Sequence, residues 1–296
     1  MKISIIGRGA WGSAMASVIE RNGHELAVLG REESDWKDSE AGEAVFIAIP
    51  TQALRERLKQ LPDPHVPVVS LMKGIEMGSF RRVSQILKEE WPNSAVAAIS
   101  GPTFASEVKQ SAPTAAVVAA ETEEVSEMIQ HAVHQKYFRL YRSSDLKGVE
   151  LGGALKNVYA IAAGMCEGLR AGENGMAALM TRSLAEMVRI AGQLGANPET
   201  IFGLSGMGDL MLTAYSGQSR NHQAGVALAR GKSLKDTLEQ IEGTVEGVPT
   251  TSAVHSLVQN KNIKAPVIEQ LYQVLYEDKS PQEGLEALVV REVYAE

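Results

Sequence analysis

One lysine, Lys156, lies in a stretch of otherwise small and apolar residues, ELGGALKNVYAIAAG (150–164). In a helix its neighbours one turn away are glycine, tyrosine and alanine residues, and none of them is acidic. Gly152 and Gly153 have no side chain, so another group can approach the helix closely there. Desolvation in such a place lowers the pKa of an ammonium from its usual value of about 10.4. We therefore expect Lys156 to exchange a proton near neutral pH or to hold a carbonyl oxygen of a substrate. The alternative is a lysine whose stem covers apolar surface.

A second dense stretch, GLSGMGDLMLTAYSGQSRNHQAG (203–225), contains four further candidates. Asp209 lies between a glycine turn and an apolar run, where a carboxylate at the start of a helix is expected and capping is the alternative role. Ser219, Arg220 and Asn221 open the next helical segment. A hydroxyl, a forked guanidinium and an amide at a helix start suit a phosphate dianion, and an ordinary capped surface helix is the alternative.

Three glycines near the N-terminus, Gly7, Gly9 and Gly12, have the spacing G-x-G-x-x-G. They follow an apolar strand pattern and open a helical pattern, and a second strand pattern comes next. In such a unit the first glycine makes a tight turn, the second lets backbone approach a pyrophosphate, and the third packs helix against strand. The diphosphate lies at the helix N-terminus. The context predicts dinucleotide binding over a merely tight turn.

The second strand pattern ends at Gly30 and Arg31, without the acidic residue that an NAD-selective site usually has there. Arg31 is suited to a 2′-phosphate, which favours NADP(H). Glu32 and Glu33 follow directly and weaken that inference, and a solvated arginine is an equal alternative.

Polar and glycine residues follow two further strand patterns. SLMKGIE places Lys73 just after one strand, and ISGPTFASE places Gly101, Thr103 and Ala105 after the next. Ligands of open α/β sheets bind outside the carboxyl ends of the strands. We expect these residues to line one crevice, although a solvated loop lysine is the default for Lys73 alone.

Alternation of short apolar runs with helical patterns in the first half predicts a parallel, doubly wound sheet, and only helices follow. The expected strands are 2–6, 25–29, 44–49, 66–71, 95–100, 114–119 and 137–141, with helices at 10–22, 51–60, 79–91 and 121–134. The later helices are expected at 146–169, 174–195, 219–230, 234–241, 248–260, 266–277 and 281–289. We therefore expect an α/β chain with a dinucleotide-binding domain at 1–145 and a helical substrate-binding domain at 146–296.

Composition excludes several classes of function. The chain has 296 residues and a net charge of −7, which gives no support to binding of nucleic acid or of anionic membranes. A single cysteine, Cys166, cannot form an internal disulfide, and no apolar run is long enough to span a bilayer. We expect a soluble cytoplasmic protein. The histidines, cysteine and carboxylates assemble no metal-ligand set and no Ser-His-Asp or Cys-His arrangement by spacing, so we expect no metal.

Taken together, these residues resemble the NAD(P)-dependent glycerol-3-phosphate dehydrogenases of the bacterial type. The matching stretches are GRGAWGSAMA, MKGIE, SGPTFASEV, PTAA, GVELGGALKNVYAIAAGM, TRSLAEM, GLSGMGDLMLT, SRNHQAG and VEGVPTT. They follow the family's order over nearly the whole chain. The resemblance implies an N-terminal Rossmann domain, a helical C-terminal domain, a homodimer, and interconversion of sn-glycerol 3-phosphate and dihydroxyacetone phosphate with NAD or NADP. Arg31 slightly favours NADPH. It also implies a role in supplying glycerol 3-phosphate for phospholipid synthesis.

The resemblance also implies roles for individual residues. Lys156 falls on the proton acceptor of the oxidation direction. Substrate positions fall on Lys73, Gly101, Thr103, Lys156, Asp209, Ser219, Arg220 and Asn221. Cofactor positions fall on Gly7, Gly9, Ala10, Trp11, Gly12, Arg31, Lys73, Ala105, Arg220, Thr244 and Glu246. Family members usually have Val where Thr244 stands, and they have a longer segment between Arg31 and Val45.

Two other functions remain open at this point. One is a two-domain reductase acting on a 2-keto or β-hydroxy acid. The other is a regulator that senses NAD(P)H without turnover, which would leave Lys156, Asp209 and Arg220 without a use.

Overall fold

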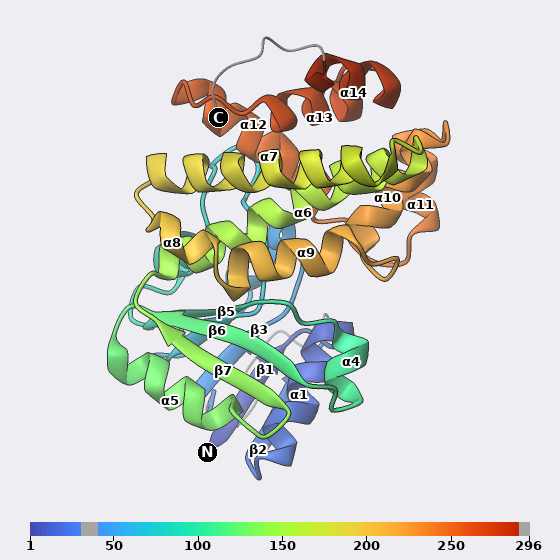
Figure 1. Ribbon diagram of the computed structural model, residues 1–296. Helices are drawn as coiled ribbons and strands as arrows, with labels where there is room; N and C mark the ends of the chain where they lie inside the picture. The colour runs from blue at the N-terminus through green and yellow to red at the C-terminus, as the bar shows by residue number, and fades with distance from the viewer. Residues whose placement is uncertain (31–40, 290–296) are drawn as a thin grey trace.

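The computed structural model describes residues 1–30 and 41–289 and has two parts, a sheet region and a helical region (Figure 1). In the described residues seven strands form one sheet in the order β2-β1-β3-β4-β5-β6-β7. Their bounds are β1 Lys2–Ile6, β2 Glu25–Leu29, β3 Ala44–Ile47, β4 Val68–Ser70, β5 Val96–Ser100, β6 Thr114–Ala120 and β7 Phe138–Ser143. All seven expected strands are therefore present. The order reverses beside β1, and this creates a topological switch point between β1 and β3.

The sheet differs from the expected parallel arrangement in one respect. Strands β1 to β5 pair parallel, but β6 pairs antiparallel to β5, and β7 is parallel to β6. A parallel return needs a crossover of a dozen or more residues, usually with a full helix. The connection from Ser100 to Thr114 meets that length but contains only the five-residue helix α4 (Ala105–Lys109) in place of a full crossover helix, and the chain returns in the opposite direction.

Alternating side chains of the strands pack on both faces of the sheet. One face is covered by α1 (Ala10–Arg21), α4 and α5 (Glu123–Val133), and the other by α2 (Leu54–Leu58) and α3 (Val83–Glu90). In β1, Ile3 and Ile5 belong to the first apolar cluster, whereas Ile6 belongs to the second. This period of two is what a strand buried on both faces requires.

The helical region lies on one side of the sheet region, with α6 at its centre (Figure 1). Its elements are α6 Leu146–Gly168, α7 Gly172–Gln193, α8 Pro198–Ile201, the π-helical turn η2 Leu204–Gly208, α9 Asp209–Ala214, α10 Arg220–Ala229, α11 Leu234–Gln240, α12 Gly247–Asn260, α13 Pro266–Tyr276 and α14 Pro281–Val289. Helix α6 packs against α7, α9, α10, α12, β5 and β6. It is buried along almost its whole length because glycine and alanine let its neighbours approach from every side.

Local turns account for the differences from the expected elements. The helix expected at 79–91 begins only at Val83, because Ile75 forms a bridge with Arg82 and Phe80 adopts a positive φ of 59°. The short elements α4, α8, η2 and α9 were not expected, since four to six residues show no clear periodicity. Over residues 1–30 and 41–289 no helix has both the length and the apolar character needed to cross a membrane.

Candidate active site

Lys156 meets its countercharge across the molecule rather than along its own helix. Its Nζ lies 2.9 Å from Oδ1 of Asp209, the first residue of α9. The other carboxylate oxygen, Oδ2, lies 2.5 Å from Nζ of Lys73, which follows β4. The Asp209 side chain is 1% exposed and that of Lys156 is 6% exposed. These three residues, the lysine cluster, bring two ammonium groups onto one buried carboxylate.

The alternative roles considered for these residues do not describe their geometry. Lys156 is buried, so its ammonium does not reach bulk water along an apolar surface. Within residues 1–30 and 41–289, Asp209 makes no capping hydrogen bond to α9, because its two carboxylate oxygens are turned toward the lysines.

The pKa of Lys156 is lowered to about 8. Burial is the largest cause, and the positive charges of Lys73 and Arg220 act in the same direction. The Asp209 carboxylate opposes them through its charge and its hydrogen bond. The sequence left open whether desolvation or the Asp209 charge has the larger effect on the pKa of Lys156. In the folded chain desolvation has the larger effect. A lysine with this pKa exchanges its proton near neutral pH.

The glycines beside Lys156 let other parts of the chain approach α6. A Cβ on Gly152 would lie 2.9 Å from the Ser205 carbonyl oxygen in η2. A Cβ on Gly153 would lie 2.5 Å from Ser100 Oγ at the end of β5, and 3.4 Å from Lys73 Cγ. Both glycines are therefore needed for α6 to reach η2 and the strand ends, which brings Lys156 to the crevice.

The residues after β4 and β5 come together as expected. Lys73 Nζ donates a hydrogen bond of 2.8 Å to the Gly101 carbonyl oxygen, and Thr103 Oγ1 donates one of 3.1 Å to the same oxygen. From α6, Asn157 Nδ2 donates to the Lys73 carbonyl oxygen at 2.9 Å. The carboxyl edge of the sheet and α6 thus meet at Lys73, where the crevice was expected.

Ser219, Arg220 and Asn221 form the start of α10, as expected, but they differ in what they contact. Ser219 is the N-cap, and its hydroxyl accepts a hydrogen bond from the His222 N–H. Asn221 is buried, donates to Asn157 Oδ1 and accepts from the Gly247 N–H, both at 2.9 Å. Arg220 is exposed, and among the described residues no carboxylate forms an ion pair with it. The cationic member of the three is therefore the one directed outward.

The glycine motif has the shape that a pyrophosphate cradle requires. Gly7 has a φ of +115°, and a Cβ on it would lie 2.3 Å from the Ala48 carbonyl oxygen. A Cβ on Gly12 would lie 2.0 Å from the Gly7 carbonyl oxygen. Around Gly9, in contrast, no heavy atom of the described chain would lie within 4 Å of an added Cβ. The tight turn and close helix packing occur at Gly7 and Gly12, and the open approach occurs at Gly9, the N-cap of α1.

The remaining expected cofactor positions of the sheet region lie beside this cradle, apart from one. Ala10 and Trp11 begin α1, and Ala105 begins α4, which packs against α1. The indole Nε1 of Trp11 is buried without a hydrogen-bond partner among the described residues. Arg31 lies outside the described residues, so the expectation about a 2′-phosphate stays a prediction.

Thr244 and Glu246 lie just before α12, and Glu246 contacts the sheet region. Its Oε1 accepts a hydrogen bond of 3.2 Å from the Thr51 N–H, at the start of the 3-10 helix η1 (Thr51–Ala53). A Cβ on Gly74 would lie 2.5 Å from Thr51 Oγ1 and 2.9 Å from Glu246 Oε2, so both oxygens border the backbone beside Lys73. Burial raises the pKa of Glu246.

Sequence reasoning missed two residues of this crevice, Thr51 and Asn157. Thr51 follows β3 at its carboxyl end, beside the switch point, so the rule that identified Lys73 would also have found it. Asn157 is adjacent to Lys156 in sequence and joins Lys73 to Asn221. No local signal distinguishes this amide from a surface asparagine.

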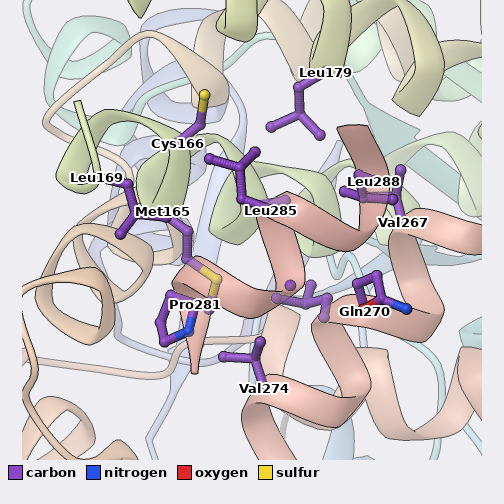
Figure 2. Close-up of a pocket in the computed structure, with 13 residues that line it drawn as sticks. Met165, Cys166, Leu169, Leu179, Val267, Gln270, Val274, Pro281, Leu285 and Leu288 are labelled. Carbon is purple, nitrogen blue, oxygen red and sulfur yellow. The ribbon is translucent and has the colours of Figure 1, made fainter. Parts of the chain in front are cut away.

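A separate pocket lies between the ends of α6 and α7 and the last two helices, and it is apolar (Figure 2). Met165, Leu179, Val274 and Leu285 point into it, and Gln270 brings the one polar amide among the described lining residues. Those lining residues include no member of the lysine cluster and no charged group, so this pocket is unsuited to a phosphate. In the part of the chain that the structure describes, no group of three or more His, Cys, Asp and Glu side chains is placed to hold a metal ion.

Comparison with known proteins identifies the family. Residues 145–286 match the family described as NAD-dependent glycerol-3-phosphate dehydrogenase C-terminus. Residues 2–41 and 37–126 match the corresponding N-terminus in two pieces.

Individual relatives give the same result over the full length. The chain is 39% identical to the glycerol-3-phosphate dehydrogenase [NAD(P)+] of Thermoanaerobacter sp., with 99% of this chain and 98% of that protein covered. It is 40% identical to that of Syntrophotalea carbinolica, with 100% and 99% covered. The crystal structure of glycerol-3-phosphate dehydrogenase from Coxiella burnetii superposes with a TM-score of 0.92 at 33% identity, covering 98% of this chain and 99% of that one. The chain therefore belongs to the NAD-dependent glycerol-3-phosphate dehydrogenase family.

Proposed function

We propose that the chain interconverts sn-glycerol 3-phosphate and dihydroxyacetone phosphate by hydride transfer with NAD(P)(H), and supplies glycerol 3-phosphate for glycerophospholipid synthesis. The observation that carries this proposal is the lysine cluster in the crevice. Two ammonium groups share one carboxylate, so one positive charge remains in excess beside a lysine of pKa about 8. Such a site suits an oxygen that gains negative charge during reduction.

The cofactor position fits the residues present. The open approach at Gly9 and the N–H groups at the start of α1 suit a pyrophosphate, and Ala10, Trp11 and Ala105 border that place. Glu246 borders the backbone beside Lys73, and Gly243, the residue before Thr244, lies beside the Arg220 guanidinium. The chemistry that a nicotinamide held here would supply is hydride exchange with C2 of the substrate. The preference for NADPH remains a proposal that rests on Arg31.

Lys156 handles the proton of the reaction. In the oxidation direction its neutral amine takes the proton of the C2 hydroxyl as the carbonyl forms. In reduction its ammonium donates that proton to the carbonyl oxygen. Asp209 orients Lys156 and holds Lys73 beside it, so the second ammonium adds to stabilisation of the developing oxyanion.

Binding of the phosphate falls to the start of α10. Arg220 supplies a forked guanidinium, and the Ser219 hydroxyl can donate while it caps the helix. Asn221 is engaged by Asn157 and Gly247, so we assign it mainly to fixing α10 against α6 and α12. Gly101 and Thr103 border the other side of the substrate, and the Gly101 carbonyl, which accepts from both Lys73 Nζ and Thr103 Oγ1, orients Lys73.

The two rival functions fit these residues less well. A 2-keto acid reductase needs a carboxylate clamp, whereas the exposed guanidinium here stands at a helix N-terminus beside a serine cap, an arrangement suited to a dianion. A sensor of NAD(P)H without turnover gives no reason for two ammonium groups on one buried carboxylate.

One spectrophotometric assay separates the three functions. The chain is mixed with NADH or with NADPH, and the loss of reduced cofactor is followed after adding dihydroxyacetone phosphate. Dihydroxyacetone without phosphate and a small panel of 2-keto acids serve as matched controls. We expect rapid oxidation of cofactor only with the phosphorylated ketone. Faster reaction with a 2-keto acid, or binding of cofactor without any turnover, would overturn the proposal.

Three further assignments accompany this function. We propose that the substrate-binding and dinucleotide-binding domains divide at 145/146, which is supported by the end of β7 at Ser143 and the start of α6 at Leu146. The separate apolar cluster of the helical region supports the same division. We also propose that the chain is a cytoplasmic homodimer, which light scattering and cell fractionation would test.

A further inference from the structure

Glu150 is a buried acidic residue to which the proposed mechanism gives no role. It is 7% exposed and lies on α6, six residues before Lys156. Its Oε1 accepts a hydrogen bond of 2.6 Å from the Ser84 N–H, and its Oε2 accepts one of 2.6 Å from Ser84 Oγ. The Arg82 guanidinium also donates to Oε2. Burial raises the pKa of Glu150, and Arg82 with Ser84 partly opposes that rise.

These contacts join α6 to the segment that carries Lys73. We define the Lys73 segment as residues 71–84, between β4 and the first turn of α3. Asn157 holds the Lys73 carbonyl near one end of it, and Glu150 holds the other end. Between these two contacts a Cβ added to Gly153 would lie 3.4 Å from Lys73 Cγ, so α6 approaches the Lys73 side chain closely there. Positions 150, 153 and 157 lie on one face of a helix, so one side of α6 follows the whole segment.

The segment also holds its own shape. Ile75 forms a bridge with Arg82, the Glu76 N–H donates to the Arg81 carbonyl at 3.0 Å, and the Phe80 N–H donates to the Glu76 carbonyl at 3.0 Å. Fixing Arg82 therefore fixes Ile75, which is two residues from Lys73. A displacement at the Glu150 end is transmitted to the Lys73 ammonium through this closed turn.

We propose that Glu150 is a positioning residue, whose carboxylate holds the Lys73 segment on α6 so that Lys73 and Lys156 meet on Asp209. This inference rests on the proposed function for its catalytic consequence. A carboxylate is needed because three donors converge on it, whereas the glutamine amide has one acceptor oxygen and would bring its own donors against Arg82 or Ser84. Replacement of Glu150 by glutamine loosens the Lys73 segment at Arg82 and Ser84, and it changes no residue of the lysine cluster.

The test compares Glu150→Gln with a matched control, Glu186→Gln. Glu186 is also buried, at 1% exposed, and also accepts three hydrogen bonds, from Tyr159 OH and from the N–H groups of Val267 and Ile268. It stabilises the helical region away from the crevice. We expect E150Q to lower kcat by about tenfold through misplacement of Lys73, and E186Q to leave kcat per folded molecule within about twofold of the unsubstituted chain. Both variants should lose stability.

The pH dependence of the rate gives a readout that a purely structural role would not change. The charged groups that face Lys156 are Asp209 on α9, Lys73 after β4 and Arg220 on α10. Withdrawal of Lys73 removes a positive neighbour and leaves the Asp209 charge less neutralised, and both changes raise the pKa of Lys156. We expect the pH midpoint of glycerol 3-phosphate oxidation to move upward in E150Q and to stay unchanged in E186Q.

A measurement without turnover separates this inference from the proposed function. The pH dependence of amine labelling at Lys156 is followed by mass spectrometry in the cofactor-free chain, where E150Q should show the same upward movement. If E150Q does not fold, Ser84→Ala removes one side-chain donor and should give a smaller change, about two- to threefold in kcat, in the same direction. A folded E150Q or S84A with unchanged Lys156 titration, or an E186Q that moves it equally, would overturn the inference even if dihydroxyacetone phosphate is the substrate.

Discussion

Two buried carboxylates in the helical region, Asp209 and Glu186, satisfy their oxygens in opposite ways. Each is 1% exposed. Glu186 accepts hydrogen bonds from neutral groups only, the Tyr159 hydroxyl and two backbone N–H groups at the start of α13. Asp209 contacts two ammonium groups, those of Lys73 and Lys156. The Glu186 arrangement caps helix α13, whereas the Asp209 arrangement places three charged groups together.

The consequences of the two arrangements for charge are also opposite. Burial raises the pKa of Glu186 and that of Tyr159 well above its ordinary value, so both groups are moved toward their neutral forms. In the lysine cluster two positive charges and one negative charge leave one positive charge in excess. The cluster is therefore incomplete without an anion or a developing oxyanion. The carboxylate of the proposed active site, Asp209, is thus paired with more positive charge than it carries negative charge. The carboxylate of the core, Glu186, is paired with neutral donors only.

The strongest test of this comparison is Lys156→Ala. Removing the amine removes the proton donor and acceptor, so we expect kcat to fall by about 10²- to 10⁴-fold. Cofactor binding should stay close to that of the unsubstituted chain, because Lys156 lies on α6 and not at the glycine cradle. Steady-state rates and cofactor titration by fluorescence measure the two quantities. Turnover within tenfold of the unsubstituted chain would contradict the assignment.

Arg220→Gln tests whether the Arg220 guanidinium binds the phosphate group of the substrate. Loss of a charge-assisted contact costs about 2 kcal/mol of binding free energy. We therefore expect KM for dihydroxyacetone phosphate to rise by roughly 30-fold. The matched control is Arg230→Gln, at the other end of α10, which should leave KM unchanged. Dihydroxyacetone without phosphate should react equally with R220Q and the unsubstituted chain. An equal loss with the phosphate-free ketone would remove Arg220 from phosphate binding.

The pH profile tests the lowered pKa of Lys156. Reduction needs the ammonium, so its rate should fall by about tenfold for each pH unit above about 8. Oxidation needs the neutral amine, so its rate should rise with pH up to about 8 and then level off. Asp209→Asn removes the group that raises this pKa, and the midpoint should move to lower pH. Identical midpoints in the two proteins would show that another group titrates.

Sequence patterns alone predicted the strands, the longer helices and the residues that follow the strand ends. The strands, the glycine cradle and the positions of Lys73 and Gly101 at strand ends follow from rules that act over a few residues. The antiparallel return of β6 did not follow, because the direction of a strand depends on how the connection through α4 packs and has no periodic signal. Similarly, the first turn of α3 was expected too early because the Ile75–Arg82 bridge has no periodic signal.

The contacts within the site were beyond sequence reasoning for a different physical reason. Lys156, Lys73 and Asp209 come from three elements, and their meeting depends on the packing of α6 against η2 and β5. Sequence marked Gly152 and Gly153 as places of close approach but could not say that the chain itself fills the space. The balance between desolvation and the Asp209 charge needs burial and distances, which only the folded chain supplies.

Tyr159→Phe is the mildest test, and it separates core from crevice on a single helix. Tyr159 lies three residues after Lys156 on α6, and its hydroxyl donates to Glu186 at 3.1 Å. Removing that donor should cost about 1 kcal/mol of stability, because Glu186 keeps its two backbone donors. Chemical denaturation measures this loss, while kcat and the pH midpoint should not change. If Y159F altered the midpoint, the two buried carboxylates would be coupled through α6, and the separation between a neutral core network and a charged site would fail.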